Sequence, residues 1–550
     1  MQLESLPNEL LLDLFRYFDS IHLLFTFYGL NSRFNNLIVI YFRFNCLNFQ
    51  HISNLNFDII CQQYLPLIID HINSLYLSDD DETPQQTKWL MSYNFNLEQF
   101  IGLQSLTLST INCEETMNKM MNQLCYLSQL QYLNIIDCYF QSSYIDNIWF
   151  IRKLIRCELN TISNFDCSNV PTIKSFSLQY FSISNVPLTK FSIEHLLEFT
   201  PCLQHLIIDF FVFSPSENLT RTISTIERLS LAFLNSSNKL ENILQNMSNV
   251  SKLTVRTWRD IYRNGYQWEN LISNYLPKLK VFNLLMQFDS DDDDDDINGE
   301  EQVDKILDSF RTQFWIDKHR WFVRCHWQSK SFSLYTLPYV FRRFTIDIDT
   351  QFKSTCIEDN TFSSYNHVKD ISFCPSLSPD FVHLRFLKLH DLCLVFPIQN
   401  EFLSIIPTLH YLTSLTIDFE KETFISFPLQ VLLDRAYHLY SLNLKQDSTL
   451  HMINLRSKSV RQLHFSSHNK YFNQQECILL SQSPLGMQCE VLRIQVKDKK
   501  NIIYLLNKMK NLRSLCFSCE NIQSQNELIE CLKQKQVDID FAHFIRLWIR

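Results

Sequence analysis

The sequence predicts a mixed α/β protein in which a short helical unit precedes a long, solenoid-like array of strands and helices. Capped, helix-periodic apolar residues fill the first 43 positions. In the rest of the chain an apolar phrase returns at intervals of roughly 23 to 30 residues, the period of a repeat array. The 550 residues are 46% hydrophobic and 19% charged, so the chain can bury a sizeable core.

The composition excludes several functions that need glycine or a basic surface. The chain has 5 glycines, all too far apart to form GxGxxG, GxxxxGK[ST] or G-x-S-x-G. We therefore expect no nucleotide cofactor bound by those motifs and no hydrolase of that kind. The net charge of -9 gives no electrostatic basis for holding a phosphate backbone, so no nucleic-acid partner is expected.

The distribution of cysteines and the lack of long apolar segments indicate the cellular compartment to expect. The 17 cysteines are scattered, and the one CxxC, from Cys516 to Cys519, has no second pair with which to bind zinc. The first residues lack a basic segment followed by an apolar one, and no stretch approaches about 18 uninterrupted apolar residues. We expect reduced thiols, no membrane partner, and a soluble intracellular protein of the cytoplasm, the nucleus or both.

Three short helices are expected within residues 1–43. Ser5 is the expected cap of the first, with Pro7 in its first turn. Asp19 or Ser20 would cap the second, Gly29 would end it, and Ser32 would cap the third. The apolar positions at helical spacing are Leu10, Leu11, Leu14, Phe15 and Phe18, then Ile21, Leu24, Phe25 and Tyr28, then Phe34, Leu37, Ile38 and Tyr41.

A helical unit of about 40 residues cannot hide all these side chains from water by itself. Further apolar residues lie beyond the three stripes, namely Leu6, Leu12, Leu23 and Phe27. Either the array that follows or a second protein must cover the surplus. The unit is therefore a helical cap on the array or a docking unit.

Two segments of the helical unit resemble the F-box motif. Residues 6–18, LPNELLLDLFRYF, are similar to its opening, and residues 31–38, NSRFNNLI, are similar to its closing segment. The resemblance covers residues 6 to about 41, and Phe34 stands where the family often has Trp. It implies a docking site for the Skp1 adaptor of cullin-type ubiquitin ligases. The residues it implies to be partner-facing are Leu6, Pro7, Leu10, Leu14, Phe15 and Leu24.

From residue 44 onward the recurring phrase is apolar-x-x-apolar-x-apolar, which resembles the strand of leucine-rich repeats. Copies begin at Leu103, Leu130, Leu203, Ile226, Val250, Leu384, Leu412, Leu439, Val460 and Leu512, and Phe176 and Phe282 are expected central positions. The resemblance is to the irregular leucine-rich arrays found behind many F-boxes. It implies a strand face whose variable polar positions bind a protein. An unrelated mixed α/β fold is the alternative.

Two acidic runs interrupt this rhythm. Residues 289–302, which contain Asp289 to Asp296, are expected to form a disordered loop between two halves of the array, 44–288 and 303–550. Attraction of a basic partner is the alternative role for this run. The shorter run from Asp79 to Glu82 is expected to be a similar solvated loop.

Residues 321–327 alternate in a way that predicts a buried strand. His319, Cys325 and His326 lie in or beside it but lack a fourth ligand at a suitable spacing, so no metal site is expected.

The leading hypothesis is a non-enzymatic substrate-recognition subunit of an SCF-type E3 ubiquitin ligase. Residues 1–43 would bind the Skp1-type adaptor and, through it, a cullin, while the array would bind an unknown protein substrate. The alternative is a leucine-rich-repeat scaffold, unconnected with ubiquitin, whose helices cap the array. Neither hypothesis requires a catalytic residue, a metal or another cofactor.

Overall fold

The protein is described by a computed structural model, which covers residues 3–160, 172–184, 193–211, 219–233, 237–258, 262–289, 299–328, 331–346, 350–356, 365–373, 384–396, 406–419, 426–445, 454–466, 471–520, 538–541 and 545–549. The chain divides into two compact units. The first comprises Met1–Lys252 with Tyr275–Lys278, and the second comprises Leu253–Asn274 with Leu279–Ile549. The boundary between the two units, at Lys252 and Leu253, therefore precedes the acidic run at 289–302, where the sequence predicts the boundary between the halves of the array.

The first unit opens with the three expected helices, α1 (Asn8–Phe15), α2 (Ser20–Phe27) and α3 (Ser32–Phe44), after a 3-10 turn at Leu3–Ser5. Asp19 caps α2 by accepting from the backbone N–H groups of Ile21 and His22, and Gly29 follows α2 at a φ of 89°. Two expected caps are wrong. Ser5 belongs to the 3-10 turn while Pro7 precedes α1, and Asn31 caps α3 in place of Ser32.

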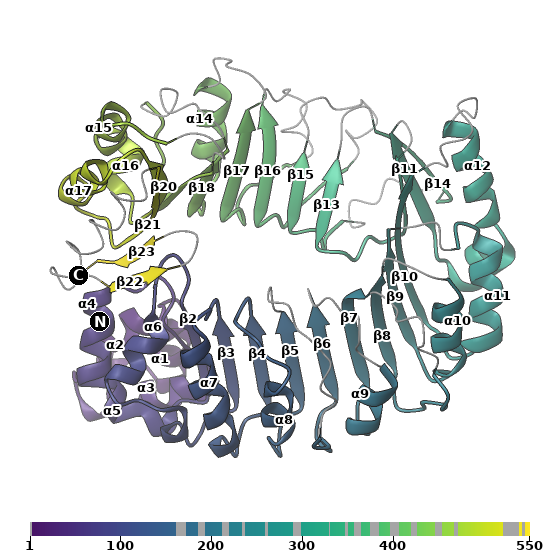
Figure 1. The fold of residues 1–550 in the computed structure, drawn as a ribbon, viewed down its shortest axis with the longest axis horizontal. Helices are drawn as coiled ribbons and strands as arrows, with labels where there is room; N and C mark the ends of the chain where they lie inside the picture. Colours follow the sequence, from purple (N-terminus) through teal and green to yellow (C-terminus); the bar gives the residue numbers. More distant parts are fainter. Residues whose placement is uncertain are drawn as a thin grey trace. The chain divides into compact units, whose positions relative to one another are not determined.

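In the described part of the first unit eight strands follow, each parallel to the next (Figure 1). They are β1 (Cys46–Asn48), β2 (Ser74–Ser78), β3 (Ser105–Ser109), β4 (Tyr132–Ile136), β5 (Arg156–Asn160), β6 (Tyr180–Ser184), β7 (His205–Phe211) and β8 (Arg228–Phe233). The connections contain α4 (Asn54–Ile59), α5 (Leu65–Ile68), α6 (Gln86–Ser92), α7 (Glu114–Gln123), α8 (Tyr144–Trp149), α9 (Ile193–Phe199) and α10 (Ser237–Gln245), with shorter turns at Ile60–Tyr64, Ile69–His71, Leu97–Gln99 and Leu124–Tyr126. Parallel strands in chain order, joined by helical connections, form a leucine-rich-repeat-like array.

The recurring phrase fills the core of this array. Leu103, Leu106 and Leu108 are fully buried, and the copies beginning at Leu130 and Leu203 are buried in the same way. The intervening strand positions are mostly half-exposed, which is the alternation expected of a sheet with one covered face. The predicted centre at Phe176 is wrong, because Phe176 is 69% exposed and Phe181 occupies the buried position in β6.

A backbone ladder holds successive repeats in register. The carbonyl of Gln104 accepts two N–H groups from the next repeat, those of Gln131 and Tyr132. The carbonyl of Gln131 does the same for Ile155 and Arg156. Cys138, three residues after the last apolar position of its repeat, closes the strand turn with its thiol beside the carbonyls of Leu108 and Ile136. Burial raises the pKa of this thiol to about 12, so it stays protonated.

The second unit begins with strands that depart from the parallel pattern. Strands β9 (Lys252–Thr257) and β10 (Val281–Asp289) are followed in the sheet by β12 (Ser331–Thr336), β11 (Val323–Gln328) and β14 (Gln351–Ser354), in the order β9-β10-β12-β11-β14. The last three pairings are antiparallel. Helix α11 (Gly265–Tyr275), helix α12 (Gly299–Ser309) and a π-helix at Phe314–His319 lie in the connections. The expected second half of the array therefore does not begin at residue 303.

The parallel array resumes at β13 (Arg343–Ile346). It continues through β15 (Asp370–Phe373), β16 (Asp391–Phe396), β17 (Ser414–Phe419), β18 (Ser441–Leu444), β19 (Gln462–Phe465), β20 (Val491–Val496) and β21 (Ser514–Cys519). Antiparallel strands β23 (Ile545–Trp548) and β22 (Asp538–Phe541) end the sheet. Helices α14 (Ser426–Arg435), α15 (Gln474–Gln482), α16 (Pro484–Gln488) and α17 (Lys499–Lys508) complete the described elements.

The phrase placed at Leu384 is out of register with the strand it should mark. Strand β16 begins at Asp391, so the three core positions of this repeat are Leu389, Leu392 and Leu394. The bounds expected for the loop, 289–302, overlap two ordered elements, since Asp289 ends β10 and residues 299–302 open α12. Residues 290–298 lie outside the described part of the chain. Within the described residues, no helix has the length and apolar character needed to cross a membrane.

Candidate protein-interaction sites

The helical unit at the start of the chain is held together by aromatic rings. Phe15 of α1 packs on Phe27 of α2 with ring centroids 5.1 Å apart, and Phe27 stacks on Phe34 of α3 at 5.7 Å. Phe15 also meets Tyr41 edge-on at 6.3 Å. Because all three helices contribute rings to one buried cluster, the trio forms a small core of its own.

Arg33 joins the two segments that resemble the F-box motif. Its guanidinium Nε donates to Asn8 Oδ1 at 2.9 Å, and its terminal nitrogens donate to the backbone carbonyls of Glu4 and Leu6. The planar fork of arginine suits several acceptors at once. The side chain thus fixes the stretch from Glu4 to Asn8 against the start of α3.

The structure divides the six residues implied to face a partner. Phe15 is fully buried among the trio's rings and Leu24 is also fully buried, so neither presents surface to another protein, and the expected partner-facing role is corrected to a packing role. Leu10 is 52% exposed, Pro7 is exposed, and Leu6 and Leu14 are half-buried. The candidate docking face is therefore Leu6, Pro7, Leu10 and Leu14, with the 88% exposed Tyr17 at the far end of α1.

Helix α2 has a different task, because it packs on the edge strand β1. The Ser20 hydroxyl donates to the Asn48 carbonyl and accepts from the Asn48 N–H, both at 3.2 Å. An unpaired edge strand exposes such groups to further strand pairing. Ser20 therefore caps the sheet edge, a function that composition and spacing did not reveal.

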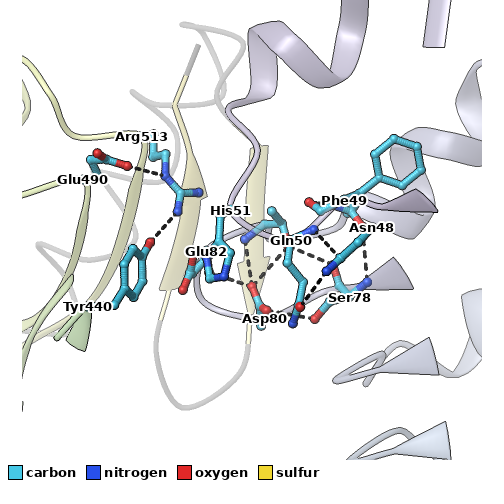
Figure 2. A network of polar contacts seen from close by, with 12 residues as sticks. Asn48, Phe49, Gln50, His51, Ser78, Asp80, Glu82, Tyr440, Glu490 and Arg513 are labelled. Carbon is cyan, nitrogen blue, oxygen red and sulfur yellow. Dashed lines mark hydrogen bonds and ion pairs between the residues drawn. The ribbon is translucent and has the colours of Figure 1, made fainter. Parts of the chain in front are cut away.

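The short acidic run from Asp79 to Glu82 is an ordered turn and not a solvated loop (Figure 2). Asp80 accepts hydrogen bonds from the N–H groups of Glu82 and Thr83, at 2.9 and 3.0 Å, and from the Ser78 hydroxyl. Asp79, which is 6% exposed, accepts from the N–H and hydroxyl of Thr87. The carboxylates in this run serve as internal acceptors, which explains why so much charge is buried here.

Two side-chain contacts connect this turn to the loop after β1 (Figure 2). Glu82 Oε2 lies 2.5 Å from His51 Nδ1, and the Gln86 amide donates to the Phe49 carbonyl at 3.0 Å. These contacts anchor the first two repeats of the array to each other.

The half-exposed strand face of the first unit carries a row of stacked side chains in register. Tyr132, Arg156, Tyr180 and His205 occupy matching positions on β4 to β7. The Arg156 guanidinium lies 4.1 Å from the Tyr180 ring centroid and 5.5 Å from that of Tyr132, and Glu158 Oε1 lies 2.5 Å from an Arg156 terminal nitrogen. Burial and Arg228 lower the pKa of His205. The row therefore presents aromatic and hydrogen-bonding groups to a partner, while the charge of Arg156 is paired with Glu158.

In the second unit, side chains just before the strands form a chain of contacts (Figure 2). Arg513, 9% exposed as a side chain, donates to Glu490 Oε2 at 3.2 Å and to the Tyr440 hydroxyl at 2.8 Å. Arg461 lies 3.3 Å from the other Glu490 oxygen. The network links the starts of β18 to β21.

The segment predicted as a buried strand at 321–327 forms one from Val323, in β11, and polar groups of this strand form internal contacts. His326 Nε2 lies 2.9 Å from the Tyr335 hydroxyl, which is 2.9 Å from the Tyr365 hydroxyl. Burial, with Arg324 nearby, holds the pKa of His326 well below its usual range. Among the residues that the structure describes, no three His, Cys, Asp or Glu side chains gather as metal ligands.

No protein-family model matches the sequence, and no curated protein matches it significantly. Three solved structures illustrate the similarity that is found. An internalin from Listeria monocytogenes is 9% identical, with 84% of this chain and 94% of that chain covered and a TM-score of 0.23. A TLR13–ssRNA13 complex is 13% identical, with 81% and 58% covered and a TM-score of 0.27.

The third is the leucine-rich-repeat ectodomain of the Arabidopsis thaliana receptor kinase GASSHO1/SCHENGEN3, at 10% identity, with 80% and 56% covered and a TM-score of 0.17. This chain therefore spans less than two thirds of the second and third structures. All three TM-scores are low, so the class of the array rests on the strand order and register of this chain itself.

Proposed function

We propose that this chain is the substrate-recognition subunit of an SCF-type ubiquitin ligase, binding a Skp1-type adaptor through α1 and a target protein through the array. One observation carries the proposal. Helix α1 buries Leu11 and Phe15, while Leu10 is 52% exposed and the adjoining Pro7 is also exposed. An apolar helical face of this kind suits a complementary groove.

The Arg33 contacts add a second line of support. The opening and closing segments of the motif are 25 residues apart at Asn8 and Arg33, yet one side chain binds both. A motif whose two ends are tied in this way presents α1 at a fixed angle. A pre-organised face loses less conformational freedom on binding than a mobile one.

In this role the chain would supply proximity and no reactive group. The adaptor would link it to a cullin, and the array would hold the target so that its lysines meet a charged ubiquitin-conjugating enzyme at high effective concentration. The polar strand faces described above suit a protein surface better than a small ligand.

The proposal is tested by capture of a Skp1-type adaptor on the full-length protein. Leu10→Ala with Leu14→Ala truncates the two leucines that α1 contributes to the docking face. Because a few apolar anchors dominate such interfaces, we expect affinity to fall by about 100-fold or more. Both side chains are at least partly exposed, so the thermal midpoint should change little.

A matched control is Leu55→Ala with Leu67→Ala, since these leucines are 61% and 60% exposed on α4 and α5 of the same unit. This variant should capture the adaptor as the parent chain does. No capture by the parent chain, or equal capture by both double variants, would overturn the ligase assignment.

The second candidate is a leucine-rich-repeat scaffold whose helices only cap the array. The two hydrogen bonds between Ser20 and Asn48 at the β1 edge support it, because they join α2 to the edge of the sheet. The two functions use different helices and are compatible. Adaptor capture distinguishes the two functions: a helical unit that only caps the array would not bind the adaptor, whereas one that also docks would.

A further inference from the structure

The parallel strands of the second unit begin along one edge of their sheet, and the residues just before them are unusually basic. Strands β15 to β21 are paired in register, so residues at equal distances before each strand stack on one another. In Figure 1 the arrows of β15, β16 and β17 all point the same way. The backbone ladder repeats here, since the His390 carbonyl accepts the N–H groups of Thr413 and Ser414.

Three positions in each repeat define this surface, those one, three and four residues before the strand. We name the side chains at these positions over β15 to β21 the basic edge. Its lysines and arginines are Lys369, Lys388, Lys458, Arg461, Lys510 and Arg513, its histidines are His367, His390, His410 and His438, and its acidic residue is Glu490. The same positions before β2 to β8 hold two basic residues, Arg152 and Lys153, one histidine, His71, and two acidic residues, Asp70 and Glu227. The charge is therefore specific to the second unit.

Ring contacts show that these positions are neighbours in space. The His410 and His438 rings, from successive repeats, have centroids 4.8 Å apart. The ring of His390 lies 6.3 Å from that of Tyr411 in the next repeat. Tyr411 and Tyr437 are 48% and 71% exposed, so the aromatic surface among these cations is open to a partner.

The carboxylates described here near this surface form ion pairs with arginines. Glu490 is shared between Arg461 and Arg513, at 3.3 and 3.2 Å. Asp370 and Asp391, the first residues of β15 and β16, both lie beside Arg342, at 2.9 and 3.4 Å.

The lysines of the basic edge are different. Lys369, Lys388, Lys458 and Lys510 are all exposed, and their ammonium groups form no ion pair with the carboxylates that the structure describes. Within the described residues, four lysine cations without counter-ions therefore lie in one strip, beside phenol and imidazole rings. The strip therefore attracts negative charge locally, although the whole chain carries a net charge of -9.

We propose that the basic edge binds acidic, extended segments of a partner protein. The proposal rests on the function proposed above and extends it, because it specifies that the target protein carries an acidic, extended segment. Seven strands at about 4.8 Å spacing make a strip of roughly 29 Å, which matches about nine residues of extended peptide. A net charge of -9 disfavours a long polyanion such as nucleic acid, whose repulsion extends beyond the strip, more than it disfavours a short acidic peptide.

The test uses the full-length protein and a fluorescein-labelled peptide of about nine residues, alternating Glu and Ala, in an anisotropy titration. A peptide with Gln in place of every Glu is the uncharged comparison. We expect the Glu peptide to bind, binding to weaken with added salt, and the Gln peptide to bind at least about tenfold more weakly.

Charge reversal at the strip should remove this binding. In Lys388→Glu with Lys458→Glu we expect affinity for the Glu peptide to fall by about tenfold or more. The matched control is Arg152→Glu with Lys153→Glu, two exposed residues at equivalent positions in the first unit, which should bind within about twofold of the parent chain. Unchanged thermal midpoints in both variants show that the fold is retained.

Unchanged peptide binding in Lys388→Glu with Lys458→Glu, or no binding by the parent chain, would overturn the proposal. So would a single-stranded oligonucleotide of equal charge that binds the strip more tightly than the peptide and is equally sensitive to this variant. Adaptor capture is measured on the same samples and should be unaffected by either charge reversal. A chain that binds the acidic peptide as expected but captures no adaptor would refute the ligase role and leave the basic edge in place.

Discussion

Replacing Arg33 with alanine tests whether one side chain holds the docking helix in place. Arg33 donates to Asn8 Oδ1 at 2.9 Å and to the carbonyls of Glu4 and Leu6. A hydrogen bond from a charged donor contributes about 1.5–3 kcal/mol when buried, but Arg33 is half-exposed and solvent screens part of this. We expect the whole set to contribute about 1–3 kcal/mol, which is a factor of roughly 5 to 150 in local opening.

Hydrogen exchange measured by mass spectrometry resolves this effect. Amides in residues 3–15 should exchange about tenfold faster in Arg33→Ala, while those of β3 to β5 keep the parent rate, because opening is local. Arg33→Lys should fall between the two, since an ammonium cannot reach three acceptors in a fork.

Arg43→Ala is the matched control, being an exposed arginine in the same helix α3. It should leave the exchange of residues 3–15 unchanged. Equal exchange in Arg33→Ala and the parent chain, or the same acceleration in Arg43→Ala, would refute the idea that Arg33 ties the two segments together.

Two further changes have defined outcomes. Ser20→Ala removes the hydroxyl that bonds both polar groups of Asn48, so denaturant unfolding should show a loss of about 1–2 kcal/mol, restored by Ser20→Thr; an unshifted transition would contradict the edge-cap role. Burial and Arg324 lower the pKa of His326, so the folded chain keeps it neutral while the unfolded chain takes up a proton below about pH 6.5. Stability should therefore fall as the pH drops through that value, by at most about 1.4 kcal/mol per pH unit, and more gently in His326→Asn; equal slopes would rule out His326 as the source.

The repeat pattern was predictable wherever apolar and polar positions alternate cleanly. Leu103, Leu106 and Leu108 mark β3 because no other residues nearby fit the phrase. Around β16 the residues Leu384, Leu387 and Leu389 fit it as well as Leu389, Leu392 and Leu394 do. Spacing alone cannot choose between two such frames, and pairing with the neighbouring strands decides.

The candidate sites were predictable only in part, for a different reason. The apolar surplus on the helices was visible in the sequence, but which side of α1 faces inward depends on where Phe27 and Phe34 arrive. The acceptors of Arg33 are partly backbone carbonyls, which no sequence pattern identifies. The basic edge becomes visible only once the strands are aligned, because its equivalent positions in successive repeats are separated by 21 to 29 residues along the chain.

Removal of the helical unit cannot by itself decide between a cap and a docking unit. Deleting residues 1–42 would lower stability under either function, because α2 and Ser20 protect the β1 edge in both. Leu10 and Leu14 belong to α1, and the hydrogen bonds to β1 come from α2. A point change on α1 therefore acts on docking while leaving the cap intact, and Ser20→Ala acts on the cap while leaving the α1 face unchanged. If adaptor capture instead followed stability across both variants, its loss would reflect partial unfolding, and the α1 face would not be the docking site.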